Sequence, residues 1–239
     1  MRLRRRSRSA SFEEVERAEH QFYVDYVRPG MTVFDVGASV GELTVLFARL
    51  AGDAGSVHAF EPGPVADELE RACSEAGRRN VVVNRVAVGD RSATVALRMY
   101  DDEHQSWNTL ADRPVRPGGV DVTPIATADV RAVTLDEYCA EGDVGRVDLL
   151  KIDVEGSEYH VLRGSERLLA EQRVRCCVFE YGGTTEDMGV DPAAIEQLLS
   201  AHGYELRNVV AGDPVFPKDT RSGAALFSMH VARPTRGAP

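Results

Sequence analysis

The sequence predicts an α/β fold in which a mostly parallel, doubly wound sheet carries helices on both faces. Strands alternate with helices from residue 31 onward, a glycine turn joins the first strand to the next helix, and acidic residues follow several strands. Such alternation favours parallel strands joined by right-handed crossovers. A chain of 239 residues has room for one sizeable domain of this kind and not for a second.

Hydrophobic periodicity and breaker residues define the expected elements. An amphipathic helix is expected over 11–27, before the alternation begins. Short apolar runs rich in β-branched residues predict strands at 31–36, 56–60, 81–88, 147–152, 174–179, 204–210 and 225–231. Helical spacing predicts helices at 41–50, 65–76 and 158–170, and Asp191-Pro192 opens another as N-cap and first helical residue.

Two segments stand apart from the alternation. Residues 1–28 form a basic arm followed by the amphipathic helix, and we expect the α/β domain to span 29–239. The range from Tyr100 to Val130 has no periodicity and is interrupted by proline and glycine. Because long structureless loops in compact domains are usually functional, we interpret this range as a substrate lid.

The composition of the chain limits the classes of molecule that it is expected to bind. A formal net charge of -10 argues against nucleic acid, which is bound through clustered Lys and Arg, and no apolar run approaches the ~18 residues of a membrane helix. The four cysteines lack metal-ligand spacing, and Cys176 and Cys177 point to opposite faces of a predicted strand. Reduced core cysteines indicate a cytoplasmic protein. A small-molecule partner remains, and a homo-oligomer is left open.

The segment from Asp35 to Gly41 runs from a strand through a glycine turn (Gly37, Ala38, Ser39) into a helix. Open α/β folds bind nucleosides at such turns. Asp35 would repel a pyrophosphate but attract the ammonium and sulfonium of S-adenosylmethionine. The third glycine of a dinucleotide motif is absent, which further disfavours a nicotinamide oxidoreductase. The alternative is that Asp35 is only a turn residue.

A second acid supports a ribose-bearing ligand. Glu61 ends the second strand in Phe60-Glu61-Pro62, about 20 residues past the glycines, where a carboxylate binds a ribose diol. Asn84 and the backbone at Ala87 are candidates for the adenine end. The predicted cofactor-binding residues are Asp35, Gly37, Ala38, Ser39, Gly41, Glu61, Pro62, Asn84, Ala87 and Asp153.

The fourth and fifth strands end in carboxylates that we expect to be neighbours, Asp153 and Glu180. Two such carboxylates are suited to bind a hard divalent ion such as Mg²⁺. Lys151, on the same face as Asp153, offers the alternative of a structural ion pair, and the sequence does not choose between them. The candidate catalytic residues are Asp153, Glu180 and His104, because an alcohol needs a base or a metal to become a nucleophile.

These motifs resemble the FkbM family of methyltransferases. The resemblance rests on the turn from Asp35 to Gly41, on Phe60-Glu61-Pro62, on Thr134-Leu135-Asp136 and above all on the segment from Lys151 to Glu158 with Val161-Leu162-Arg163-Gly164. The resemblance covers roughly residues 30–182 and implies a Rossmann-like class I methyltransferase fold, S-adenosylmethionine as donor and O-methylation of a sugar, polyketide or other natural product. Ser39 replaces the usual Asn, and Glu42 replaces an aromatic residue.

The sequence therefore predicts a methyltransferase that acts on a hydroxyl of a small molecule. The alternatives are an N-methyltransferase, which needs no metal because a neutral amine is already nucleophilic, and an inactive module that binds S-adenosylmethionine. The intact set of Asp35, Glu61 and Asp153 argues against the inactive module. The identity of the acceptor does not follow from the sequence.

Overall fold

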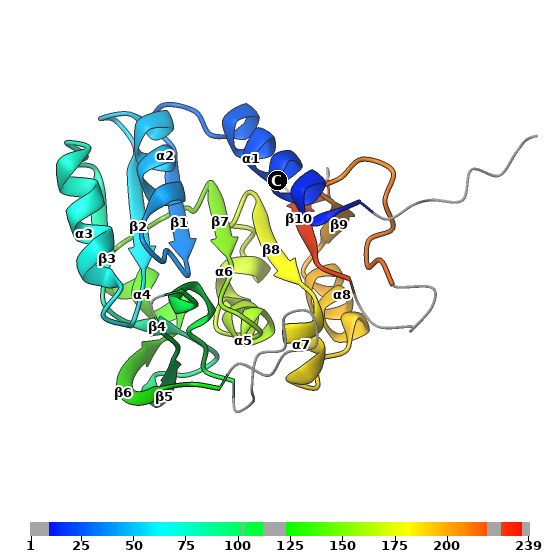
Figure 1. Ribbon diagram of the computed structural model, residues 1–239. Helices are drawn as coiled ribbons and strands as arrows, with labels where there is room; N and C mark the ends of the chain where they lie inside the picture. Colours follow the sequence, from blue (N-terminus) through cyan, green and yellow to red (C-terminus); the bar gives the residue numbers. More distant parts are fainter. Residues whose placement is uncertain (1–9, 102, 112–122, 219–225, 236–239) are drawn as a thin grey trace, which may run out of the picture.

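The computed structural model describes residues 10–101, 103–111, 123–218 and 226–235 (Figure 1). The predicted basic arm lies almost wholly outside these residues, as do residue 102 and residues 112–122 of the predicted lid and the first residue of the predicted strand at 225–231. Within the described ranges, no helix is long and apolar enough to cross a membrane.

A seven-stranded sheet forms the centre of the molecule, in the order β3-β2-β1-β7-β8-β10-β9 (Figure 1). Its strands are β1 (Thr32–Val36), β2 (Ser56–Phe60), β3 (Val81–Asn84), β7 (Leu149–Ile152), β8 (Cys177–Tyr181), β9 (Tyr204–Asn208) and β10 (Ser228–Pro234). The first five in the order are parallel, and β10 runs antiparallel to both of its neighbours. The predicted Rossmann-like α/β fold is confirmed.

Helices cover both faces of this sheet. They are α1 (Phe12–Tyr26), α2 (Glu42–Ala51), α3 (Ala66–Glu75), α4 (Leu135–Glu141), α5 (Glu158–Arg163), α6 (Glu166–Ala170), α7 (Gly183–Asp187) and α8 (Pro192–Ala201), with a short 3₁₀ turn η1 (Gln105–Trp107). One core cluster contains side chains of α4, α5, α6 and α8, a second contains side chains of α1 and α2, and a small third contains side chains of α3. Cys177 lies in the first cluster and Cys176 in the second, as the period of a strand requires.

Helix α1 is anchored into the α1/α2 core cluster rather than standing apart from the domain. Ser11 and Glu14 form a capping box at its start, and Val15 and Tyr23 are buried. The Tyr23 ring meets Phe47 of α2 edge-on at 4.9 Å between centroids. This packing holds α1 against α2, although the division of the chain at residue 28 stays a prediction.

The predicted strand at 81–88 is wrong, because it divides between two sheets. Strand β3 ends at Asn84, and β4 (Ala87–Val88) pairs with β6 (Ala126–Val133), which also pairs with β5 (Ala93–Met99). The polar residue Arg85 breaks the run and binds Asp67 and Glu70 of α3. Figure 1 shows this three-stranded sheet beyond the arrowheads of β1 and β2.

The second sheet also corrects the predicted lid. Residues 126–130 of that range belong to β6, and residues 105–107 form η1, so the lid is not structureless there. The predicted helix at 158–170 is likewise two helices, α5 and α6, because the chain bends at Gly164. A Cβ at Gly164 would lie 1.9 Å from the carbonyl oxygen of Gly89, so only glycine permits this close approach.

Candidate active site

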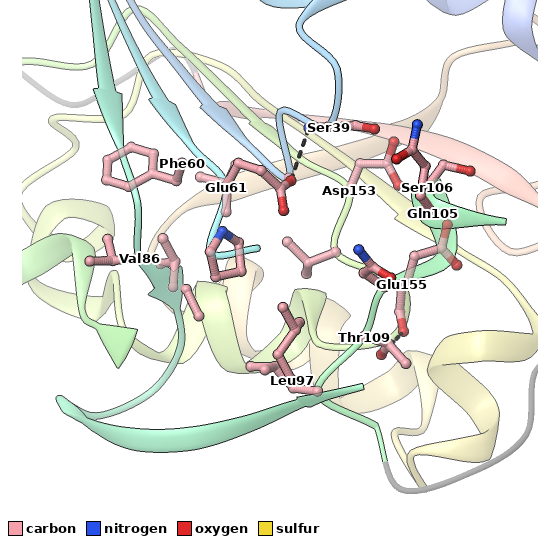
Figure 2. Close-up of a pocket in the computed structure, with 18 residues that line it drawn as sticks. Ser39, Phe60, Glu61, Val86, Leu97, Gln105, Ser106, Thr109, Asp153 and Glu155 are labelled. Carbon is pink, nitrogen blue, oxygen red and sulfur yellow. Dashed lines mark hydrogen bonds between the residues drawn. The ribbon is translucent and has the colours of Figure 1, made fainter. Parts of the chain in front are cut away.

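A cavity of about 550 Å³ lies at the carboxyl ends of β1, β2 and β7 (Figure 2). The predicted cofactor residues that line it are Gly37, Ser39, Glu61, Pro62, Ala87 and Asp153. Phe60 and Val86 lie at one side in Figure 2, whereas Asp153, Glu155, Gln105 and Ser106 lie at the other. The cavity thus has one apolar end and one polar end, as expected for a mixed ligand such as a nucleoside with a charged tail.

The glycine turn is shaped by close backbone contacts. Gly37 has φ +79°, and a Cβ there would lie 1.8 Å from the carbonyl oxygen of Asp153. The N–H groups of Gly37 and Ala38 donate to the carbonyl oxygen of Phe60, at 3.0 and 3.1 Å. Gly41 lies outside the cavity lining, where a Cβ would meet a methyl of Leu69 at 2.7 Å. The turn therefore joins the ends of three strands into one rigid wall.

Glu61 is held by backbone donors. Its carboxylate accepts the N–H of Ser39 at 3.0 Å and the N–H of Gly63 at 3.3 Å, and it is only 7% exposed (Figure 2). Burial raises the pKa of Glu61, and the two N–H donors act in the opposite direction. The side chain is thus oriented before any ligand arrives, with its carboxylate on the cavity wall.

Asp35 lies behind the cavity wall and not at the lip of the site as expected. It is fully buried, accepts a hydrogen bond from Thr44 Oγ1 at 2.6 Å and lies 3.3 Å from Lys151 Nζ. Asp35 and Lys151 are register partners on β1 and β7. Its proposed effect on a cofactor stays a prediction, which now has to act through Lys151.

Lys151 connects the glycine turn to Asp153. Its ammonium lies 3.4 Å from the Asp153 carboxylate and donates to the carbonyl oxygen of Gly37 at 2.8 Å. Burial lowers the pKa of Lys151, but the charges of Asp35 and Asp153 outweigh it, so this pKa is raised above its ordinary value. The structural ion pair left open by the sequence is therefore present.

Three carboxylates gather beside the polar end of the cavity, and two of them, Asp153 and Glu155, line it. Oxygen atoms of Asp153, Glu155 and Glu180 lie within 4.8 Å of one another. Burial and the neighbouring carboxylates raise the pKa of Glu180 well above its usual range, and Glu180 hydrogen-bonds Asp153. Sequence reasoning paired Asp153 with Glu180 and missed Glu155. The Asp-x-Glu spacing was the available signal, although the segment is not extended, since Glu155 has a left-handed φ of +55°.

Glu158 locks the loop that carries this cluster. It is fully buried, and its carboxylate accepts the N–H groups of Val154 and Gly156, both at 3.1 Å. Thr185 of α7 donates to its other oxygen at 3.3 Å. Glu158, in the first turn of α5, thus holds the backbone on either side of Glu155.

The remaining sequence candidates lie outside the cavity lining. Asn84 donates to the carbonyl oxygens of Ala59 and Val82, at 3.1 and 3.3 Å. His104 pairs with Asp101 at 2.6 Å and stacks near Trp107, with 4.4 Å between ring centroids. The residues that sequence reasoning missed come from the second sheet and its connection: Val86, Leu97, Gln105, Ser106, Asn108 and Thr109.

A long-range contact ties this connection to the acidic loop. Thr109 Oγ1 donates to the carbonyl oxygen of Glu155 at 2.8 Å, and the backbones of Arg98 and Thr109 pair with each other. No sequence pattern joins positions 46 residues apart in this way. The contact brings η1 and the end of β5 over the cavity.

Comparisons with known proteins agree with this fold and site. The chain is similar to an rRNA methylase structure from Streptococcus thermophilus, with a TM-score of 0.52, 12% identity, and coverage of 95% of this chain and all of that one. At this identity the likeness shows the fold alone, which is that of Rossmann-like methyltransferases.

Sequence relatives identify the family. Residues 35–206 match the model of a protein family that is described as "Methyltransferase FkbM domain". The chain is 32% identical to 31-O-demethyl-FK506 methyltransferase FkbM of Streptomyces tacrolimicus over 80% of this chain and 78% of that protein. It is 26% identical to hexuronic acid methyltransferase AglP of Haloferax volcanii over 70% of this chain and 61% of that protein. The chain belongs to the FkbM family of methyltransferases.

Proposed function

We propose that this methyltransferase transfers the methyl group of S-adenosylmethionine to a hydroxyl oxygen of a small molecule. One observation carries the proposal: a single cavity is lined by the backbone-oriented Glu61 carboxylate and, at its polar end, by Asp153 and Glu155, with Glu180 beside these two acids. The names of two relatives support a small-molecule acceptor, one 31-O-demethyl-FK506 and the other a hexuronic acid. The four buried free cysteines support the cytoplasm as compartment.

The residues fit S-adenosylmethionine. Glu61 offers two acceptor oxygens to a ribose diol, and Val86, Ala87 and Leu97 offer apolar surface to an adenine ring. Asp153 supplies negative charge toward a cationic tail. When bound, this donor supplies an activated methyl group on a sulfonium. The chain itself has to orient the donor and the acceptor and to remove a proton.

Proton removal is the chemistry that we assign to Asp153. Its side chain is 37% exposed, so it can meet a hydroxyl, and Lys151 holds its position from behind. Glu180 orients Asp153 by hydrogen bonding to it. His104 remains an outside candidate for the base, because its neighbours Gln105 and Ser106 line the cavity although it does not.

We propose Mg²⁺ as a second group that these residues suit. Asp153 and Glu180 would hold it, with Glu155 as a third ligand, since carboxylate oxygens are the hard ligands that Mg²⁺ prefers. When bound, Mg²⁺ would supply Lewis-acid chemistry that lowers the pKa of the acceptor hydroxyl. Chelation by excess EDTA is expected to abolish turnover, with recovery on added Mg²⁺. Full turnover in EDTA would leave Asp153 as a simple base without a metal.

Cofactor binding is tested by calorimetric titration with S-adenosylhomocysteine and with NAD. The first is expected to bind and the second not. Glu61→Gln removes the charge from the proposed hydrogen bonds between Glu61 and the ribose diol. This change costs about 1.5–3 kcal/mol of binding free energy per hydrogen bond. Glu70→Gln, an exposed glutamate on α3, is the matched control and keeps the parent affinity. Equal affinity in Glu61→Gln, or tight binding of NAD, would overturn the proposal.

A further inference from the structure

A second cavity, open to solvent, lies between α1 and the first turn of α2. Its lining shares only Asp153 with the cofactor cavity, among the residues that the structure describes. We propose that this cavity binds the acceptor, and that the acceptor is a hydroxylated amine cation such as an amino sugar. The inference rests on the proposed function, because it assigns the second substrate of the same reaction.

The position of Asp153 is the first reason to place the acceptor in this cavity. Methyl transfer is an in-line displacement, so the acceptor oxygen has to approach from the side of the methyl group opposite to sulfur. A cavity on that path must meet the cofactor cavity at the residue that takes the proton. Asp153 is that residue in both linings, and its carboxylate therefore stands between donor and acceptor.

The charge of the residues that line the cavity is the reason to expect a cationic acceptor. Its charged side chains are five carboxylates and one guanidinium, together with one histidine: Glu13, Glu16, Glu19, Glu42 and Asp153, with Arg17 and His20. Tyr23 and Leu43 are its apolar side chains. Such a lining attracts a cation that donates hydrogen bonds and repels a carboxylate. It offers little surface to a large apolar ring, so neither an acidic sugar nor a large apolar acceptor suits it.

The side chain of Glu19 is held in place within this cavity by a hydrogen bond. Tyr23 is fully buried, and its hydroxyl donates to the Glu19 carboxylate at 2.6 Å. Glu19 lines the same cavity as Asp153, and it is near enough to Asp153, Lys151 and Asp35 for their charges to influence it. A carboxylate held in this way is a ready partner for an ammonium group of the acceptor, whose hydroxyl then lies toward Asp153.

The reaction then balances without a further reactant. The acceptor oxygen forms a bond to the methyl carbon as the carbon–sulfur bond breaks, and the bonding pair stays on sulfur, which becomes a neutral thioether. The hydroxyl proton passes to Asp153 and then to water. The products are a methyl ether, S-adenosylhomocysteine and one proton, so the amine of the acceptor is not consumed.

The test uses three analogues of S-adenosylmethionine in which a nitrogen replaces sulfur. In place of the methyl group they carry a propyl, a 3-aminopropyl or a 2-carboxyethyl chain. This chain points along the path of methyl transfer, from the cofactor cavity toward the proposed acceptor cavity. Calorimetric titrations run at pH 8, where Glu19 is ionised although burial raises its pKa to about 7. The aminopropyl analogue is expected to bind at least tenfold more tightly than the other two.

Variants locate the effect. Glu19→Gln is expected to reduce the preference for the aminopropyl chain to less than threefold, whereas affinity for S-adenosylhomocysteine stays within twofold. Glu196→Gln removes the same charge from the exposed side of α8, on the opposite face of the sheet, and keeps the preference. Equal affinity for the three analogues, a best-bound carboxylate, or a preference retained in Glu19→Gln overturns the inference. If the parent protein does not bind S-adenosylhomocysteine, the proposed function is overturned instead.

Discussion

The two cavities that meet at Asp153 are built in different ways. The cofactor cavity is made by strand ends and turns, whose side chains and backbone are held by buried partners such as Lys151 and Glu158. The cavity between α1 and α2 is made by helix side chains, most of them exposed, around the single fixed pair of Glu19 and Tyr23.

This difference teaches where change is tolerated. A substitution in the cofactor cavity has to disturb the sheet, because its walls are also the ends of β1, β2 and β7. A substitution on the outer surface of α1 changes a charge and little else. The same fold can thus keep one donor while its acceptor varies, and the predictions below measure how far the two cavities differ.

The largest effect is expected for Lys151→Met. The change leaves Asp35 fully buried without its cation, and breaking a buried pair costs about 3–5 kcal/mol of unfolding free energy. Urea denaturation monitored by circular dichroism measures this loss. The double variant Asp35→Asn/Lys151→Met removes both charges and is expected to recover more than half of it. A cost below about 1 kcal/mol for the single variant would show that the pair does not support the cofactor wall.

Gly37→Ala is expected to cost about 3 kcal/mol of unfolding free energy, since a left-handed φ and a clash with the carbonyl oxygen of Asp153 add together. Gly30 is the matched control. It also has a positive φ, +87°, but a Cβ there meets nothing within 4 Å, so Gly30→Ala costs about 1 kcal/mol. Equal losses in thermal or urea unfolding would mean that φ alone matters and that the close approach at Gly37 is relaxed.

The pH dependence of stability probes the hydrogen-bonded pair of Glu19 and Tyr23 on α1. Burial, the largest cause, raises the pKa of Glu19 from 4.5 to about 7. The folded state therefore binds more protons than the unfolded state between these values, and stability falls as pH rises through this window. Relative to Glu19→Gln, the parent is expected to lose about 2.5 kcal/mol of unfolding free energy between pH 5 and pH 8.

Parallel urea denaturation curves of the two proteins at pH 5, 6, 7 and 8 make this measurement. The comparison cancels the contributions of other buried groups, such as Glu158 and Glu180, which are the same in both proteins. Identical slopes of stability against pH would show that Glu19 is exposed to solvent rather than held against the ion network.

The smallest effect is expected for Glu16→Gln, on the exposed surface of α1. Its unfolding free energy and its affinity for S-adenosylhomocysteine stay within about 0.5 kcal/mol of the parent values, because an exposed side chain makes few contacts. Calorimetry and urea unfolding check both. A loss above 1 kcal/mol in either would erase the distinction between a rigid and a tolerant cavity.

Much of the cofactor half was predictable because its signals are local. The glycine turn from Asp35 to Gly41 and the acid Glu61 mark the ends of two adjacent strands, and parallel strands bring such ends together. The alternation of apolar residues likewise predicted which elements form the sheet. Local patterns did not show that Arg85 would break one strand run or that Gly164 would bend one helix, since both depend on distant partners.

The acceptor half was not predictable in the same way. Glu19 occurs on the apolar side of α1, four residues from Val15 and from Tyr23, and this position alone was a weak signal for a buried carboxylate. Its partners Lys151 and Asp153 follow more than 130 residues later. Only the packing of α1 against the sheet brings these charges together.

By itself, the sequence determined the fold class, the glycine turn and the family, since each depends on periodicity, backbone freedom or spacing within a short segment. The tertiary structure decided three further things: that Asp35 is buried behind Lys151, that Glu155 joins Asp153 and Glu180, and that α1 lines a second cavity. The physical reason is that a buried charge takes its partners from whatever elements the sheet order and helix packing place beside it. That order is a property of the whole chain.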